Sequence, residues 1–181
     1  ILKDLFHVRK EDPFLTKSSN NGFYRKGVHQ GADAFLNCLD MIHRENKSNP
    51  KIKRDRLDLG LLKENLLHDM KSIDLFSIGG GSFVQYFRDE KISLSDNILD
   101  KIKASVMKNF KDYLDSDEPK DDRILTSLIH SICRLDRNRT FEGYQFNLVV
   151  FNEKNETIRI NEPIGKFNFI DDLPYAFIYK D

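Results

Sequence analysis

Apolar positions recur at helical spacing along the first two thirds of the chain. Between Asp33 and Glu45, apolar residues lie three or four positions apart, which predicts an amphipathic helix that Asp33 can cap. The same spacing predicts four further helices. They are marked by Leu59, Leu62, Leu66 and Met70; by Phe83, Val84 and Phe87; by Ile98 or Leu99, Ile102, Val106 and Phe110; and by Ile124, Leu128, Ile129 and Ile132.

The period falls towards two after Asn138. Residues 144–151 predict the best strand of the chain, and their near-continuous apolar end indicates a central strand buried on both faces. A turn is expected over 152–156, and residues 157–161 and 176–179 predict two further strands. Helices followed by strands indicate an α+β fold with a small, mostly antiparallel sheet.

The length of 181 residues fits one domain. We expect residues 1–22, which end in a turn-like polar run, to form a loosely ordered N-terminal arm, and residues 23–181 to form a single α+β domain. Because the sequence starts at Ile1 rather than Met, we expect either a fragment of a longer polypeptide or a chain whose first residues are not included. No apolar run reaches 18 residues, so we expect no contact with a membrane.

Basic and acidic residues balance, at 29 each. This balance argues against a domain that holds nucleic acid by itself, because phosphate neutralisation dominates such binding. Two local basic patches remain, which are either solvated surface or contacts for nucleic acid or a partner protein. The first patch is Lys51, Lys53, Arg54 and Arg56, and the second is Arg134, Arg137 and Arg139.

The two cysteines, Cys38 and Cys133, have neither the number nor the spacing of a disulfide framework or a zinc site. The five histidines are scattered, without a metal-binding pair. We therefore expect a reducing compartment, no metal and no cofactor. The Gly-rich run at 79–81 lacks the Lys of a phosphate loop, so it is interpreted as a tight turn with Ser82 as a helix cap.

The start of the first helix resembles the layout of papain-like cysteine hydrolases, in which a Cys at a helix N-terminus is held as thiolate. Here the equivalent position holds Ala34, and no His follows His130. Cys38 lies one turn further along, on the predicted apolar face, where a free Cys acts as a small buried hydrophobe. A cysteine hydrolase, of the deubiquitinase kind, that pairs Cys38 with His29 or His43 is the alternative interpretation.

Several blocks together resemble a known family. They are residues 23–30, 34–39, 77–87, 109–114 and 147–151. In this order and spacing they resemble a module in the large subunit of the early transcription factor of poxviruses and related nucleocytoplasmic large DNA viruses. The resemblance spans most of residues 23–180. A weaker resemblance is to an ovarian-tumour-type or papain-like fold with its Cys and His replaced.

The family resemblance implies a role in viral early transcription, in the virion and the host cytoplasm. In that family the large subunit pairs with a helicase-like small subunit, engages promoter DNA and recruits the viral RNA polymerase. No promoter-binding residue of the family can be placed on this sequence. We predict a non-catalytic protein-interaction module with no small-molecule substrate. The alternatives are the hydrolase at Cys38 and a nucleic-acid-binding module that uses the first basic patch.

Overall fold

The computed structural model describes residues 28, 30–45, 58–91, 98–155, 157–161 and 169–180. The predicted arm over residues 1–22 lies outside them. In chain order the elements are α2 (Ala34–Glu45), α3 (Leu59–Asp69), η1 (Met70–Ser72), η2 (Ile78–Gly81), α4 (Ser82–Phe87), α5 (Ile98–Asp115), α6 (Asp122–Ile132), β1 (Asn147–Lys154), β2 (Thr157–Ile160) and β3 (Tyr175–Lys180). The α+β class with helices first is confirmed.

The sheet has three strands in the order β2-β1-β3. β1 pairs with β2 antiparallel and with β3 parallel, so the sheet is mixed rather than mostly antiparallel. Parallel neighbours need a crossover connection, and here β2 lies within the connection from β1 to β3. β1 is central, as predicted, and its first five residues are buried. It continues through Lys154, so the reversal falls at Asn155, later than the predicted turn begins.

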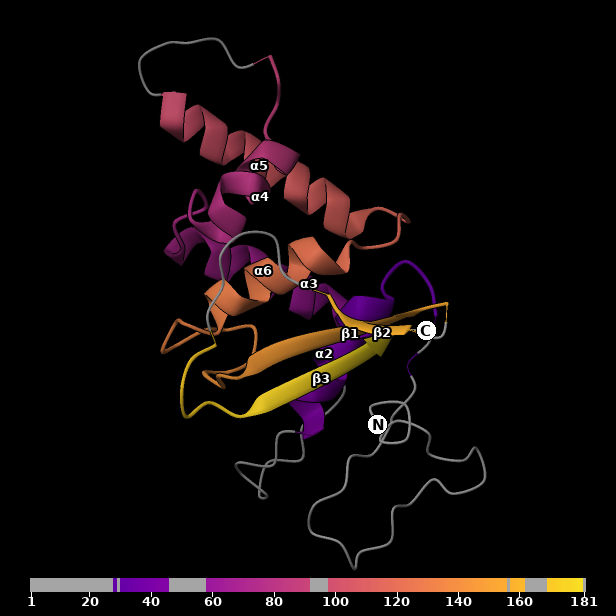
Figure 1. Cartoon of the computed structure of the whole chain (residues 1–181). Helices are drawn as coiled ribbons and strands as arrows, with labels where there is room; N and C mark the ends of the chain where they lie inside the picture. The colour runs from indigo at the N-terminus through magenta and orange to yellow at the C-terminus, as the bar shows by residue number, and fades with distance from the viewer. Residues whose placement is uncertain are drawn as a thin grey trace, which may run out of the picture.

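The helices cover one face of this sheet. Figure 1 shows α4, α5 and α6 stacked above the strands, with α6 the nearest to β1. The side chains of Leu148, Val150 and Ile178 join the buried cluster formed with the helices. Val149 and Phe151 are buried outside that cluster, as the alternation of side chains along a strand requires.

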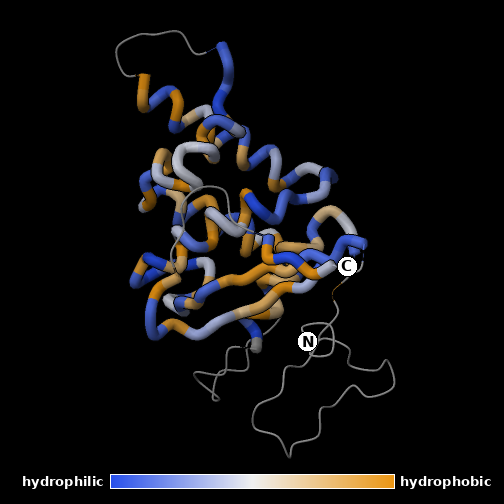
Figure 2. Tube along the Cα trace, viewed as in Figure 1, coloured by the Kyte–Doolittle hydropathy of each residue, from blue (hydrophilic) through white to orange (hydrophobic). Residues whose placement is uncertain are grey.

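α5 is amphipathic, and Figure 2 shows hydrophobic and hydrophilic residues alternating along it. Val106 and Phe110 of the predicted face are fully buried, and Leu114 extends that face by one turn. Of the two alternatives for its start, Leu99 is 58% exposed and does not belong to the face. The ring of Phe110 lies 5.2 Å from that of Phe83, which fixes α4 on α5.

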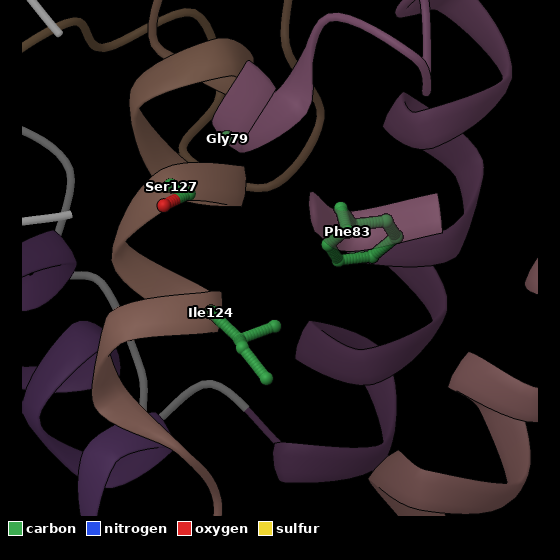
Figure 3. A pocket seen from close by; sticks show the side chains of 4 residues that line it. All are labelled: Gly79, Phe83, Ile124 and Ser127. Carbon is green, nitrogen blue, oxygen red and sulfur yellow. The ribbon is translucent and has the colours of Figure 1, made fainter. Parts of the chain in front are cut away.

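The Gly-rich run forms the tight turn that the sequence predicts. Gly79, Gly80 and Gly81 have φ angles of 58°, 62° and 89°, which an L side chain rarely adopts. Gly81 occupies the N-cap position of α4 and no side chain caps this helix, so the predicted Ser82 cap is wrong. The void between η2, α4 and α6, lined by Phe83 and Ile124 among others, is too narrow for a water molecule (Figure 3). It offers no space for a phosphate group.

Candidate functional site

A 14-residue loop, residues 133–146, joins α6 to β1 and carries the second predicted basic patch. We call it the Arg loop. The side chains of Arg134, Arg137 and Arg139 are all exposed on it. The other predicted patch, Lys51, Lys53, Arg54 and Arg56, lies outside the described residues.

A buried carboxylate at the end of α3 holds the middle of the Arg loop. Asp69 is 2% exposed and accepts hydrogen bonds from the backbone N–H groups of Arg139 (3.0 Å) and Thr140 (2.8 Å) and from the Thr140 hydroxyl (2.7 Å). The side-chain amide of Asn65, one turn earlier in α3, donates to the carbonyl of Arg139 at 3.3 Å. A buried charge is tolerated when donors surround it, and these donors fix the backbone that presents Arg139.

A buried side-chain amide, that of Asn138, links separate residues of the Arg loop. The Nδ2 of Asn138 donates to the carbonyls of Leu135 (3.3 Å) and Tyr144 (3.2 Å), while its Oδ1 accepts from the backbone N–H of Phe141 (2.9 Å). The N–H of Gly143 donates to the Asn138 carbonyl at 2.8 Å. Gly143 has a φ of 79°, so a side chain at this tight reversal would strain the backbone.

An aromatic side chain anchors the loop in the core. Phe141 is fully buried, and its ring lies 4.9 Å from that of Phe146 and 6.4 Å from the imidazole of His43 on α2. The Nε2 of His43 also lies 3.8 Å from the Oε1 of Glu142. The structure therefore places His43, a candidate partner for Cys38, under the Arg loop.

A histidine closes the base of the loop, where α6 and β1 meet. The Nε2–H of His130 donates to the carbonyl of Leu148 at 2.9 Å; the tautomer follows because a carbonyl can only accept. Burial lowers the pKa of His130 to about 4, and the positive charge of Arg134 also lowers it. His130 is therefore neutral at pH 7 and acts as a hydrogen-bond donor that ties the two ends of the loop together.

The exposed charges of the Arg loop are mixed. Its three arginines accompany two exposed acids, Asp136 and Glu142, so the loop carries a net charge of +1 (3 − 2). Within the described part of the chain, the guanidinium groups of Arg137 and Arg139 form no ion pair. Both side chains are exposed, and each guanidinium group carries five N–H donors.

The region around Cys38 has a different character. Cys38 is partly buried and packs against the core, and this burial raises the pKa of its thiol to about 11. At neutral pH the thiol is therefore almost entirely protonated, which argues against a nucleophile there. Among the described residues Cys38 forms no hydrogen bond, and its other candidate partner, His29, lies outside them. Cys133 is also buried, and its pKa is raised to about 12.

The opening of α2 holds an ion pair in place of a reactive group. The Oδ2 of Asp33 lies 3.2 Å from the Nζ of Lys63 on α3, and this contact joins the two helices.

Over the described ranges, no three His, Cys, Asp or Glu side chains group as a metal site would require. No helix in that same part of the chain has the length and apolar character to span a membrane.

Comparisons of the chain with protein-family models, with curated proteins and with solved structures gave no match.

The residues that shape the Arg loop, above all Asp69, Asn138 and Phe141, carried no sequence signal of that role. Asp69 lies 70 positions before Arg139, so no local spacing connects the two residues.

Proposed function

We propose that this chain is a non-catalytic protein-interaction module that binds a partner protein through the Arg loop. The observation that carries the proposal is a set of three exposed arginines on a backbone held by the buried side chains of Asp69, Asn138 and Phe141.

Binding energetics support this use of the loop. Arginine is enriched at protein interfaces, and its planar group can hold a carboxylate through two parallel hydrogen bonds. A loop that is already fixed loses little conformational entropy on binding, so more of the contact energy appears as affinity. The partner that fits is a protein surface with exposed Asp or Glu side chains.

The proposal in its narrower form is a module of a viral early transcription initiation factor. Its partners would be the other factor subunit and the viral RNA polymerase, and promoter DNA would be engaged through the parent protein. The setting would be the virion and the host cytoplasm. The blocks named in the sequence, including 77–87 and 147–151, support this narrower form. The raised pKa of Cys38 favours it over the hydrolase.

The test compares wild-type chain with the triple variant Arg134→Gln, Arg137→Gln and Arg139→Gln, each tagged and expressed in cells infected with a large DNA virus. Proteins recovered on the tag are quantified by mass spectrometry. We expect polymerase and factor subunits on the wild-type chain and a loss of roughly tenfold or more on the triple variant, since each lost charge-assisted contact weakens binding several-fold.

A matched control removes three exposed positive charges elsewhere, with Lys91→Gln, Lys103→Gln and Lys108→Gln. This control should retain the same partners. If the wild-type chain recovers no transcription protein, the narrower form is wrong. If the control loses its partners as strongly as the Arg variant, the Arg loop is not the contact.

A further inference from the structure

The β1–β2 hairpin, at the end of β1 remote from the Arg loop, borders an open depression of about 530 Å³. The lining residues are mostly amides and cations. They are Asn152, Lys154, Asn155, Thr157, Arg159, Ile160 and Asn161.

The strand register places the polar part of this lining on one face. Asn152 lies opposite Arg159, and Lys154 lies opposite Thr157. Directly opposed side chains share a face, about 5 Å apart, and diagonal neighbours such as Lys154 and Arg159 lie roughly 7–8 Å apart. Their cationic groups can therefore converge on one small anion between them.

A third cation, Lys180, lies on the other side of β1. Lys180 pairs with Asn152 in the parallel register, so Arg159, Asn152 and Lys180 cross the sheet in line. The Nζ of Lys180 lies 3.4 Å from the Oδ2 of Asp122, at the start of α6. That ion pair leaves Lys154 and Arg159 as the cations available to a ligand.

The lining contains donors but, within the described residues, no carboxylate. The nearest acid along β1, Glu153, points to the opposite face, where it accepts a hydrogen bond from the Tyr179 hydroxyl. In the same part of the chain, neither Lys154 nor Arg159 forms an ion pair. A site with two unpaired cations and several amide donors suits phosphate oxygens, which only accept hydrogen bonds.

We propose that this depression binds a nucleotide through its phosphate groups, with Arg159 and Lys154 as the phosphate contacts and the Asn amides on the sugar or base. The volume lies in the range of small-molecule sites and exceeds what a phosphate ion alone would fill. A free nucleotide and one unit of a single strand present the same chemistry. No sequence pattern marks this site, because strand pairing brings the residues of β1 and β2 together on one face.

The test measures binding of ATP and of a short fluorescent oligodeoxythymidylate to the full chain at low salt, by calorimetry and by anisotropy. We expect at least one of the two to bind, and the double variant Lys154→Gln with Arg159→Gln to bind roughly tenfold or more weakly. Binding of ATP alone would identify a free nucleotide as the ligand, whereas binding of the oligonucleotide would identify a strand.

The control is a double variant with one Lys and one Arg removed at a distance, Lys103→Gln with Arg88→Gln, which are both exposed. It should bind as the wild-type chain does. Absence of binding by both probes overturns the proposal, and so does an equal loss in the control. Because all four substitutions are on the surface, the melting temperature should stay unchanged, and this is checked for each variant. The outcome is independent of partner binding by the Arg loop.

Discussion

The Arg loop and the opening of α2 are both polar segments at the end of a helix, but their polar groups have different tasks. The backbone of the Arg loop is held by two buried side chains: Asp69 of α3 accepts hydrogen bonds from it, and Asn138 of the loop donates to it. At α2, the potentially reactive group, Cys38, lies against apolar side chains and has a raised pKa. In the first region polar side chains fix the backbone of a surface loop, whereas in the second the burial of Cys38 disfavours its thiolate.

The difference shows that the burial of a polar side chain does not by itself indicate a catalytic role. The buried carboxyl group of Asp69 accepts three hydrogen bonds from Arg139 and Thr140, so it anchors the Arg loop. Cys38 has no such partner among the described residues, so its burial suppresses the ionised form.

The largest effect is expected from Asp69→Ala. The substitution leaves the N–H groups of Arg139 and Thr140 and the Thr140 hydroxyl without their acceptor, and we expect the free energy of unfolding to fall by about 4 kcal/mol. Urea unfolding followed by circular dichroism measures it. Asp136→Ala, an exposed acid on the same loop, is the control and should change stability by less than about 0.5 kcal/mol. Equal effects would mean that Asp69 does not anchor the loop.

The next effect is a loss of stability in mild acid. His130 has a folded pKa of about 4, below its ordinary value of 6.5, so the unfolded chain binds the extra proton between these values. Above pH 6.5 the free energy of unfolding has the full contribution of neutral His130. This contribution is lost as the pH falls towards 4, and the free energy of unfolding then decreases by about 3 kcal/mol in total. His130→Gln keeps a donor for the Leu148 carbonyl but does not titrate. Unfolding curves at several pH values should therefore diverge between wild type and variant; parallel pH profiles would contradict the assigned neutral His130.

The smallest effect is kinetic and concerns Cys38. Because burial raises its pKa from 9.0 to about 11, alkylation by iodoacetamide at pH 7 should be roughly a hundredfold slower in the folded chain than in urea. Cys133, with a pKa of about 12, should react more slowly still and provides an internal comparison. Peptide mass spectrometry measures both rates. Labelling of folded Cys38 at the unfolded rate would remove the contrast between the two regions and restore the hydrolase hypothesis.

The elements of the fold were largely predictable, because each helix and strand is specified by local spacing. The apolar positions of α5 and α6 and the continuous run of β1 gave type and order correctly. The direction of β3 was not predictable. The alternating pattern of residues 175–180 is the same for either orientation of the strand, so it does not specify the parallel pairing with β1.

The candidate site was predictable only in its exposed part. The spacing of Arg134, Arg137 and Arg139 marked a basic patch, and the structure shows that one loop carries all three. Their support depends on Asp69 and His43, which come from α3 and α2. Contacts between residues so far apart in sequence leave no local pattern, so a single sequence does not reveal them.

The pairing of β1 with β3 has a consequence for the integrity of the molecule. The side chain of Asn147 binds the backbone just before β3: its Nδ2 donates to the carbonyls of Ile170 and Leu173, and its Oδ1 accepts from the N–H of Ile170. A chain truncated before Tyr175 would convert the buried middle strand into an open edge, with its apolar run ready to pair with another molecule. β3 thus covers the backbone edge of the apolar middle strand and occupies the edge position itself.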